Sequence, residues 1–210
     1  MKEERVYSKQ QRLDSPKALI LVDIINGFLN EGNLADKSLN RIVPAVVELV
    51  EHFVNKGYVI IALNDGHPKD SAEFSLFPGH CEEGSWQSQL IDELKPYEKN
   101  MFVVNKNSNG GAHVREFQQV LDGMPNLKEI VWAGVSSDVC VMRNVGSTMD
   151  YMLEQNRAIK YILPKDVTGA YDLQGHPQQE YNQSALAIMQ GWGVDVVPTY
   201  NYEQDFASVQ

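Results

Sequence analysis

The chain has 210 residues, of which 43% are hydrophobic and 22% charged, and its formal net charge is -10, from 28 Asp and Glu against 18 Lys and Arg. Such a composition is typical of one globular domain that is large enough to bury a substantial core. The negative charge argues against nucleic acid or an anionic membrane as a partner. No apolar run approaches the roughly 20 residues that a membrane span requires.

The N-terminal segment is polar and lacks the apolar stretch of a signal peptide, so we expect a cytoplasmic, reducing location. In that compartment Cys81 and Cys140 are expected to be free thiols rather than a disulfide. The sequence divides into an N-terminal extension at 1–16, one domain at 17–198 and a polar C-terminal tail at 199–210.

Short apolar runs alternate with helical patterns along the domain. The runs are continuous rather than alternating, which predicts strands buried on both faces, as in a parallel sheet. Strands are expected at 17–23, 58–63, 102–105, 130–133, 159–163 and 194–197, and helices at 40–56, 86–94, 114–121, 139–154 and 178–190. The segment 26–32 and the long segment 64–84 are expected to be loops. This pattern predicts an α/β protein, layered helix–sheet–helix, with a six-stranded, mainly parallel sheet.

Polar and titratable residues follow most of these predicted strands. The carboxyl ends of parallel strands share one edge of a sheet, and ligands bind there in open α/β folds. The residues concerned are Asp23, Asp65, His67, Lys106, Ser136, Cys140 and Asp166. Their shared position is the main argument from the sequence for an enzyme.

Cys140 follows the fourth strand at the point where a helical pattern begins. The positive end of a helix favours thiolate over thiol, which would make Cys140 a nucleophile. Asp23 could then take the thiol proton and later activate water, while Lys106 stabilises the thiolate. The alternative is an Asp23–Lys106 ion pair beside an inert buried cysteine.

The loop after the second strand contains Asp65, His67, Glu73 and His80. Two imidazoles and two carboxylates form a plausible site for a divalent metal, with Zn, Fe(II) and Mn all suitable. Alternatively, this is a polar loop whose side chains only bond backbone, and Asp70 or Glu82 could replace Glu73 as a ligand. His52 and His176 are assigned structural roles, and His113 is placed at the surface.

The order and spacing of Asp23, Lys106 and the segment Gly134-Val-Ser-Ser-Asp-Val-Cys140-Val resemble the cysteine hydrolases of the isochorismatase-like superfamily, over roughly residues 17–198. Asn64-Asp-Gly-His67-Pro and Leu76-Phe-Pro-Gly-His80-Cys-Glu-Glu-Gly84 look like the metal loop of nicotinamidases, which hydrolyse nicotinamide to nicotinate and ammonia. The resemblance implies a Rossmann-like fold, a homo-oligomer, a catalytic triad of Asp23, Lys106 and Cys140, and one divalent metal, with Zn favoured over Fe or Mn.

The resemblance also implies a cis peptide between Val135 and Ser136. The backbone N–H groups of Ser136 and Cys140 would then form the oxyanion hole. The pyridine nitrogen of the substrate would bind the metal, and Phe28 and Phe77 would line the pocket.

Three departures from the family concern the pocket wall rather than the triad. Ile25 stands where the family commonly has Gln, Phe77 stands where it often has Trp, and the segment Asn107–Ala112 replaces a Ser-Ala-Phe stretch. One alternative is therefore a related cysteine amidohydrolase with a different small amide substrate, in which the metal is structural or absent. Another alternative is a binding protein that keeps the fold without turnover.

Overall fold

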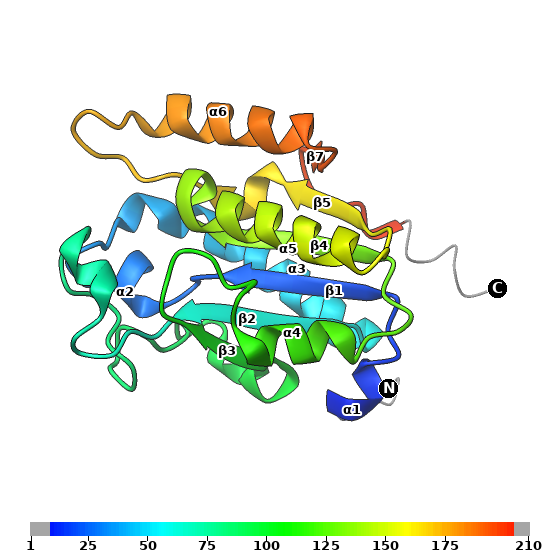
Figure 1. Ribbon diagram of the computed structural model, residues 1–210. Helices are drawn as coiled ribbons and strands as arrows, with labels where there is room; N and C mark the ends of the chain where they lie inside the picture. The colour runs from blue at the N-terminus through cyan, green and yellow to red at the C-terminus, as the bar shows by residue number, and fades with distance from the viewer. Residues whose placement is uncertain (1–8, 204–210) are drawn as a thin grey trace, which may run out of the picture.

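The protein is an α/β sandwich built on a seven-stranded parallel sheet (Figure 1). The computed structural model describes residues 9–203. The strands are β1 (Lys17–Val22), β2 (Val59–Asp65), β3 (Phe102–Lys106), β4 (Glu129–Val135), β5 (Lys160–Pro164), β6 (Thr168–Gly169) and β7 (Asp195–Val197). Their order is β3-β2-β1-β4-β5-β7, and β6 pairs with β4.

Helices cover both faces of this sheet. In Figure 1, α3 lies behind the sheet, whereas α4, α5 and α6 lie in front of it. The helices are α1 (Lys9–Arg12), α2 (Asn26–Leu29), α3 (Val43–Lys56), α4 (Arg115–Asp122), α5 (Met142–Glu154) and α6 (Gln178–Gly191). Short 3-10 or π turns are η1 (Lys37–Ile42), η2 (Ala72–Ser75), η3 (Lys95–Asn100), η4 (Ser137–Val141) and η5 (Lys165–Val167). The α/β class and the parallel sheet predicted from the sequence are confirmed.

Strand β1 shows why its apolar run is continuous. Leu19 and Leu21 pack in the core on the α3 side, whereas Ala18, Ile20 and Val22 pack in the core on the side of α4, α5 and α6. Successive side chains of a strand point to opposite faces, so a strand covered on both faces must be apolar at every position.

The six strands expected from the sequence are present, with ends shifted by a few residues. The seventh, β6, contains only Thr168 and Gly169, which is too short to produce a pattern. Helix α3 is preceded by η1, has Pro44 in its first turn, and ends at Gly57 in the left-handed conformation with φ of 72°. The Pro and Gly at its two ends are the residues that the sequence argument used.

The helix predicted at 86–94 is wrong. This segment forms turns, and its carbonyl groups accept hydrogen bonds from the start of α2 instead of from within a helix. Asn26 N–H bonds the carbonyl of Gln89 and Gly27 N–H bonds that of Gln87, at 3.0 and 2.9 Å. These tertiary bonds override the local helical pattern. The segment 26–32, expected to be a loop, accordingly contains the one-turn helix α2.

Gly134 allows β1 and β4 to approach closely at their carboxyl ends. Its φ is +136°, and a Cβ at this position would lie 2.1 Å from the carbonyl oxygen of Val22. Only glycine avoids this clash and adopts this conformation without strain. The close approach brings the chain after β4 next to Asp23, which follows β1.

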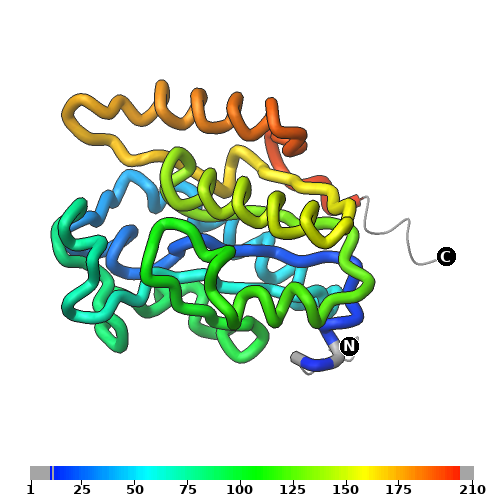
Figure 2. Tube along the Cα trace, in the orientation of Figure 1, coloured from blue at the N-terminus to red at the C-terminus, as the bar shows by residue number. Residues whose placement is uncertain are grey.

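The strands end on one side of the molecule, and the described ends of the chain lie on the opposite side (Figure 2). In the tail, Tyr200 is buried and its ring lies 5.8 Å from that of Phe53 in α3. Residues 1–8 of the predicted extension and 204–210 of the predicted tail lie outside the described residues. Among those that are described, no helix combines the length and apolarity needed to cross a membrane.

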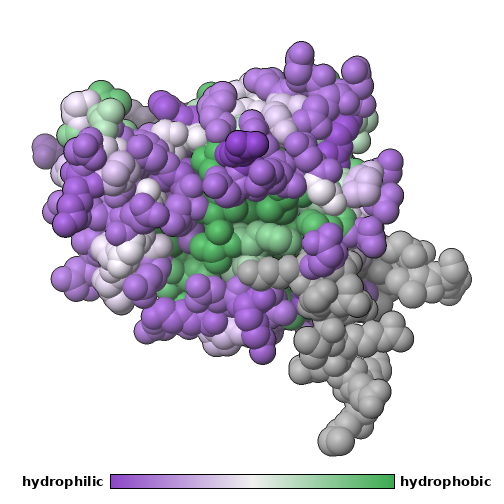
Figure 3. Space-filling view, turned by 60° about the horizontal axis from the view of Figure 1, so that its bottom comes forward, coloured by the Kyte–Doolittle hydropathy of each residue, from purple (hydrophilic) through white to green (hydrophobic). Residues whose placement is uncertain are grey.

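Strand β3 forms one edge of the sheet, and its outward-facing Val103 is exposed. Figure 3, which turns the β3 side of the molecule toward the viewer, shows an apolar area bordered by polar side chains. This area lies away from the edge at which the strands end (Figure 1 and Figure 3).

Candidate active site

Three neighbouring strands bring Asp23, Asp65 and Lys106 together. Asp23 directly follows β1, and Asp65 and Lys106 are paired in register at the ends of β2 and β3. Lys106 Nζ lies 2.8 Å from Asp23 Oδ2 and also bonds Asp65 Oδ1. The backbone N–H of Asp65 donates to Asp23 Oδ1 at 2.8 Å. None of the three residues is more than 2% exposed, so one ammonium serves two buried carboxylates.

This sharing separates the proton affinities of the two carboxylates. Burial and the charge of Asp65 raise the pKa of Asp23 to about 6, although Lys106 opposes the shift. Burial also acts to raise the pKa of Asp65, but Lys106 and the imidazoles of His67 and His80 hold it well below its usual range. Burial would lower the pKa of Lys106, yet the two carboxylates raise it, so the side chain is an ammonium. Asp23 is therefore the carboxylate that can accept and release a proton near neutral pH.

Cys140 lies in the turn η4 that leads from β4 into α5. Its Sγ and one oxygen each of Asp23 and Asp65 all lie within 4.8 Å of one another. Sγ is also 3.5 Å from Asn109 Oδ1. Burial raises the pKa of the Cys140 thiol well above its usual value, while Lys106 acts in the opposite direction. The helix-terminus argument predicted a lowered pKa; burial and two nearby carboxylates outweigh that effect, so the resting group is a thiol with a base at hand.

The peptide bond between Val135 and Ser136 is cis, as the resemblance implied. It directly precedes η4, whose Val139 and Val141 N–H groups both bond the carbonyl of Ser136. The first N–H groups of a helical turn lack partners within it. The cis peptide thus stands directly before the turn that contains Cys140.

A second group of ligating side chains lies beside Lys106. Asp65, His67 and His80 are all buried and offer ligand atoms within 4.8 Å of one another. Nε2 of His67 and Nε2 of His80 each lie 3.5 Å from Asp65 Oδ2. The two imidazole rings are 4.6 Å apart between centroids.

The remaining ring nitrogens show how these imidazoles are oriented. His67 Nδ1 lies 2.9 Å from Asn107 Oδ1, and His80 Nδ1 lies 2.8 Å from the carbonyl oxygen of Pro78. Both partners are acceptors, so each Nδ1 carries a proton and each Nε2 faces the Asp65 carboxylate. Nε2 of His67 is buried without a hydrogen-bond partner. A buried imidazole nitrogen that faces a carboxylate oxygen, with an acceptor behind the other ring nitrogen, is the arrangement of a metal-ligating histidine.

Glu73, the remaining ligand predicted from the sequence, is not in this three-residue group. Its Oε1 accepts a hydrogen bond from Asn109 Nδ2 at 2.8 Å. Burial and the charge of Asp65 raise the pKa of Glu73. Glu73 still lines the same cavity as Asp65 and His80, so the structure brings it to the site at greater distance from the other three.

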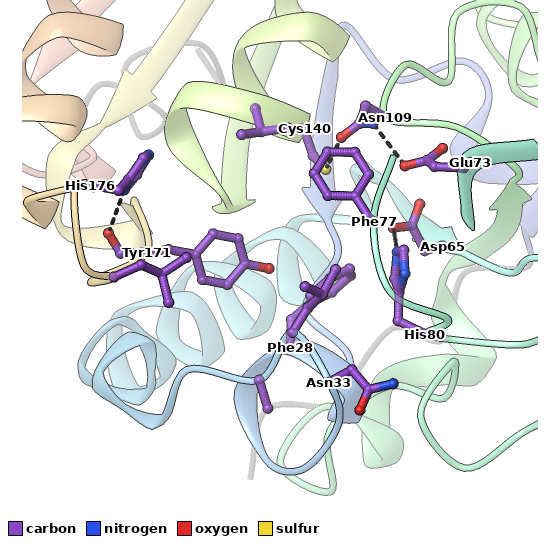
Figure 4. Close-up of a pocket in the computed structure, with 14 residues that line it drawn as sticks. Phe28, Asn33, Asp65, Glu73, Phe77, His80, Asn109, Cys140, Tyr171 and His176 are labelled. Carbon is purple, nitrogen blue, oxygen red and sulfur yellow. Dashed lines mark hydrogen bonds and ion pairs between the residues drawn. The ribbon is translucent and has the colours of Figure 1, made fainter. Parts of the chain in front are cut away.

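The cavity over these groups has a volume of about 280 Å³. Figure 4 shows Cys140 between two sets of side chains, with His80, Asp65 and Glu73 on one side and Tyr171 and His176 on the other. The aromatic rings of Phe28, Phe77 and Tyr171 form much of the wall. An apolar cavity with few convergent polar groups is the form that small-molecule sites take.

Sequence reasoning missed some of the residues that line this cavity. Asn109 bonds both Cys140 and Glu73, and it lies in the Gly/Asn/Ser loop that follows Lys106. Tyr171 and His176 come from the segment after β6, where the sequence shows no pattern that predicts a site. The sequence assigned His176 a structural role, whereas its side chain borders the cavity.

Asp166 was expected at the shared edge and is not in the site. It is exposed and does not line the cavity. The reason is local: β5 ends at Pro164 and η5 turns Asp166 outward before β6 returns to the sheet beside β4. His113, expected at the surface, is exposed.

Comparisons with known proteins identify the family of the chain and solved structures of similar fold. The family model of the isochorismatase domain matches residues 17–192. The chain is 28% identical to nicotinamidase 1 of Arabidopsis thaliana, covering 90% of this chain and 88% of the relative. Its fold is similar to the pyrazinamidase of Pyrococcus horikoshii in complex with zinc, with a TM-score of 0.74, 22% identity, and coverage of 87% and 99%. It is also similar to N-carbamoylsarcosine amidase of Thermoplasma acidophilum, with a TM-score of 0.71, 22% identity, and coverage of 87% and 96%.

Proposed function

Because this chain belongs to the isochorismatase family, we propose that it is a metal-containing amidohydrolase that converts nicotinamide to nicotinate and ammonia. The observation that carries the proposal is that Cys140, Asp65 and His80 line one cavity, while Asp23 lies close to Cys140 and His67 completes a buried group with Asp65 and His80. The first set performs acyl transfer, and the second holds a metal beside it.

The residues of the first set support a thioester mechanism. Asp23 takes the proton from the Cys140 thiol, and the sulfur attacks the carboxamide carbon. Lys106 stabilises the negative charge on both groups. The carbonyl electron pair moves to oxygen, and the backbone N–H groups of Ser136 and Cys140 stabilise the oxyanion. Protonated Asp23 then gives its proton to the nitrogen, so that the C–N bond breaks and ammonia leaves.

The same carboxylate serves the second half of the reaction. Asp23 removes a proton from water, and the hydroxyl attacks the thioester carbon. The C–S bond breaks, the acid leaves, and the sulfur recovers a proton from Asp23. A carboxyl group with a pKa of about 6 suits both directions of transfer.

A divalent metal would be held by Asp65, His67 and His80, and Glu73 is the further carboxylate within the cavity. Two imidazoles and a carboxylate favour Zn, and they also suit Fe or Mn. When bound, the metal supplies a Lewis acid that anchors a ring nitrogen of the substrate. Phe28, Phe77 and Tyr171 would enclose the ring, which is the contact that a flat aromatic amide offers.

A related amidase with another small amide substrate is the second candidate. It is favoured by the departures in the pocket wall, above all Asn107–Ala112, from which Asn109 reaches both Cys140 and Glu73. An added amide in the cavity favours a substrate with a further polar group.

The expected homo-oligomer and cytoplasmic location stay predictions, and light scattering on the purified protein tests the first of them.

The test combines metal analysis with ammonia release. Purified protein should carry an equimolar divalent metal and release ammonia from nicotinamide, and Cys140→Ala should keep the metal and release none. Release from another small amide, but not from nicotinamide, would select the second candidate. If no amide separates the wild type from Cys140→Ala, the chain is a binding protein rather than an enzyme.

A further inference from the structure

A single carboxylate connects the turn before α5 to the far wall of the cavity. Asp138 lies in η4, two residues before Cys140. Its Oδ1 accepts a hydrogen bond from Ser136 Oγ at 2.5 Å, and its Oδ2 lies 2.7 Å from His176 Nε2. Ser136 carries one of the two N–H groups that we assign to the oxyanion. We call residues 136–140 the oxyanion turn. Asp138 thus joins Ser136 of this turn to His176.

The surroundings of His176 give both of its ring nitrogens an acceptor. Nδ1 lies 3.0 Å from the carbonyl oxygen of Tyr171, in addition to the Nε2 contact with Asp138. The ring of Tyr181, from α6, stacks on it at 3.6 Å between centroids with an interplanar angle of 26°. A ring that donates from both nitrogens is an imidazolium, and Asp138 is the charged group in contact with it among the described residues.

His176 also closes a short turn that forms part of the cavity wall. We call residues 171–176 the cavity turn. Leu173 N–H and His176 N–H each bond the other residue's carbonyl, at 3.3 and 2.9 Å. Tyr171, Leu173 and His176 line the cavity, and Figure 4 shows Tyr171 and His176 on the opposite side from His80 and Asp65. The cavity turn makes a further contact through the backbone N–H of Asp172, which bonds Asp36 Oδ2 at 2.9 Å.

We propose that Asp138 and His176 are positioning residues that connect the cavity turn to the oxyanion turn. Their contact fixes the position of the cavity turn relative to the carbonyl group that reacts. This inference rests on the proposed amidase function. Neither side chain takes part in proton transfer. Asp138 orients Ser136 through its hydroxyl group, and His176 holds Tyr171 and Leu173 in place.

The two residues should therefore affect different kinetic constants. Loss of His176 releases the cavity turn but leaves the Ser136–Asp138 bond, so the main effect is weaker substrate binding. Loss of Asp138 removes its contacts with both His176 and Ser136, so the Ser136 N–H that donates to the oxyanion is also held less firmly. A residue that only supports folding would change the amount of folded protein without separating KM from kcat.

Steady-state ammonia release from nicotinamide tests this separation. We expect His176→Ala to raise KM by about 10-fold with kcat nearly unchanged, which is the size of one lost charged hydrogen bond. His176→Gln should recover part of the loss, because its amide can still donate to Asp138. Asp138→Ala should raise KM similarly and also lower kcat by about 10-fold. Asp172→Asn, which alters the exposed side chain of the same turn, is the matched control and should change neither constant.

Ser136→Ala removes the same hydrogen bond from its other end while keeping the backbone N–H. Its effect on kcat should not add to that of Asp138→Ala, because both changes break one contact. This variant also tests the proposal if Asp138→Ala folds poorly. Additive effects of the two changes, or equal loss of activity in Asp172→Asn and His176→Ala, would overturn the inference.

A measurement without turnover separates this inference from the proposed function. In protein labelled with 15N-histidine, the His176 resonances are assigned by their loss in His176→Gln. We expect both ring nitrogens of His176 to be protonated at neutral pH in the wild type, and one of them to lose its proton in the isosteric variant Asp138→Asn. If the wild type processes no amide, the proposed function fails and this result still decides the Asp138–His176 link. A neutral His176 that is insensitive to Asp138→Asn contradicts it.

Discussion

Asp23 and Asp65 stand at the ends of neighbouring strands, yet their surroundings give them opposite chemistry. Both carboxylates are buried and both bond Lys106. The pKa of Asp23 is raised to about 6, by burial first and then by the charge of Asp65. For Asp65, burial acts in the same direction, but Lys106 and two imidazoles lower the pKa below its usual range.

The difference comes from what lies beyond the shared lysine. Cys140 Sγ lies within 4.8 Å of an oxygen of each carboxylate, but Asp65 also forms a group with His67 and His80, which Asp23 does not join. A carboxylate that stays ionised is a ligand, and one that titrates near neutral pH is a proton carrier. We infer that one ammonium divides the site into a proton-transfer half and a metal half, and the following experiments test that division.

The largest effect is expected in the proton-transfer half, at the nucleophile. Cys140→Ala should lower kcat by about four orders of magnitude or more, as the loss of a covalent nucleophile does. The matched control is Cys81→Ala. Cys81 is also buried and burial raises its pKa strongly, but it does not line the cavity. Equal activity loss in the two variants would show that burial, rather than nucleophilic attack, explains the effect.

Asp23→Asn should lower kcat by about 10²- to 10⁴-fold, because the isosteric amide cannot accept the thiol proton. In the wild type, kcat/KM should fall as the pH drops through about 6, since protonated Asp23 is not a base. The variant should lose this acidic limb and keep its bound metal. Persistence of the limb in Asp23→Asn would assign it to another group.

Substitutions in the metal half should lower metal binding and leave the nucleophile reactive. Asp65→Ala or His67→Ala should lower metal affinity by more than the roughly 10- to 100-fold that loss of an outer partner costs. Nicotinamide KM should rise with the loss of metal, while iodoacetamide should still alkylate Cys140. Elemental analysis and mass spectrometry measure the two outcomes. Full metal content in both variants would remove these residues from the ligand set.

The smallest effect is expected at Asn107, which contacts the predicted ligand His67 rather than the metal itself. Asn107 Oδ1 lies 2.9 Å from His67 Nδ1 and also accepts from Ser71 Oγ at 2.7 Å. Asn107→Ala should weaken metal binding by about 10- to 100-fold and leave Cys140 alkylation unchanged. Ser75→Ala is the control, because the exposed Ser75 hydroxyl donates to the backbone carbonyl of Ala72 within η2. Competition with a chelator measures both affinities.

Much of this site could be predicted because its residues occupy repeated positions in a periodic fold. Asp23, Asp65, Lys106 and Cys140 each follow an apolar run, and parallel strands carry their ends to one edge. His67 and His80 belong to a long loop of unusual composition. Asp166 satisfied the same rule and is not in the site, because the rule does not specify which way the chain turns after a strand.

Asn109, Tyr171 and His176 could not be predicted in the same way. Each reaches the cavity from a segment without periodicity, and each contact depends on how loops fold against strands that are distant in the sequence. The helix predicted at 86–94 fails for the same reason, since the carbonyls of Gln87 and Gln89 accept hydrogen bonds from the start of α2 rather than from a following helical turn.

The sequence by itself determined the layered α/β fold and the edge at which chemistry collects, because both follow from local periodicity and strand direction. Only the tertiary structure decided how one lysine is shared by two carboxylates, which of them titrates, and that Asp138 joins Ser136 to His176. Proton affinities and bridging contacts depend on burial and on distances between side chains, which exist only once the chain has folded.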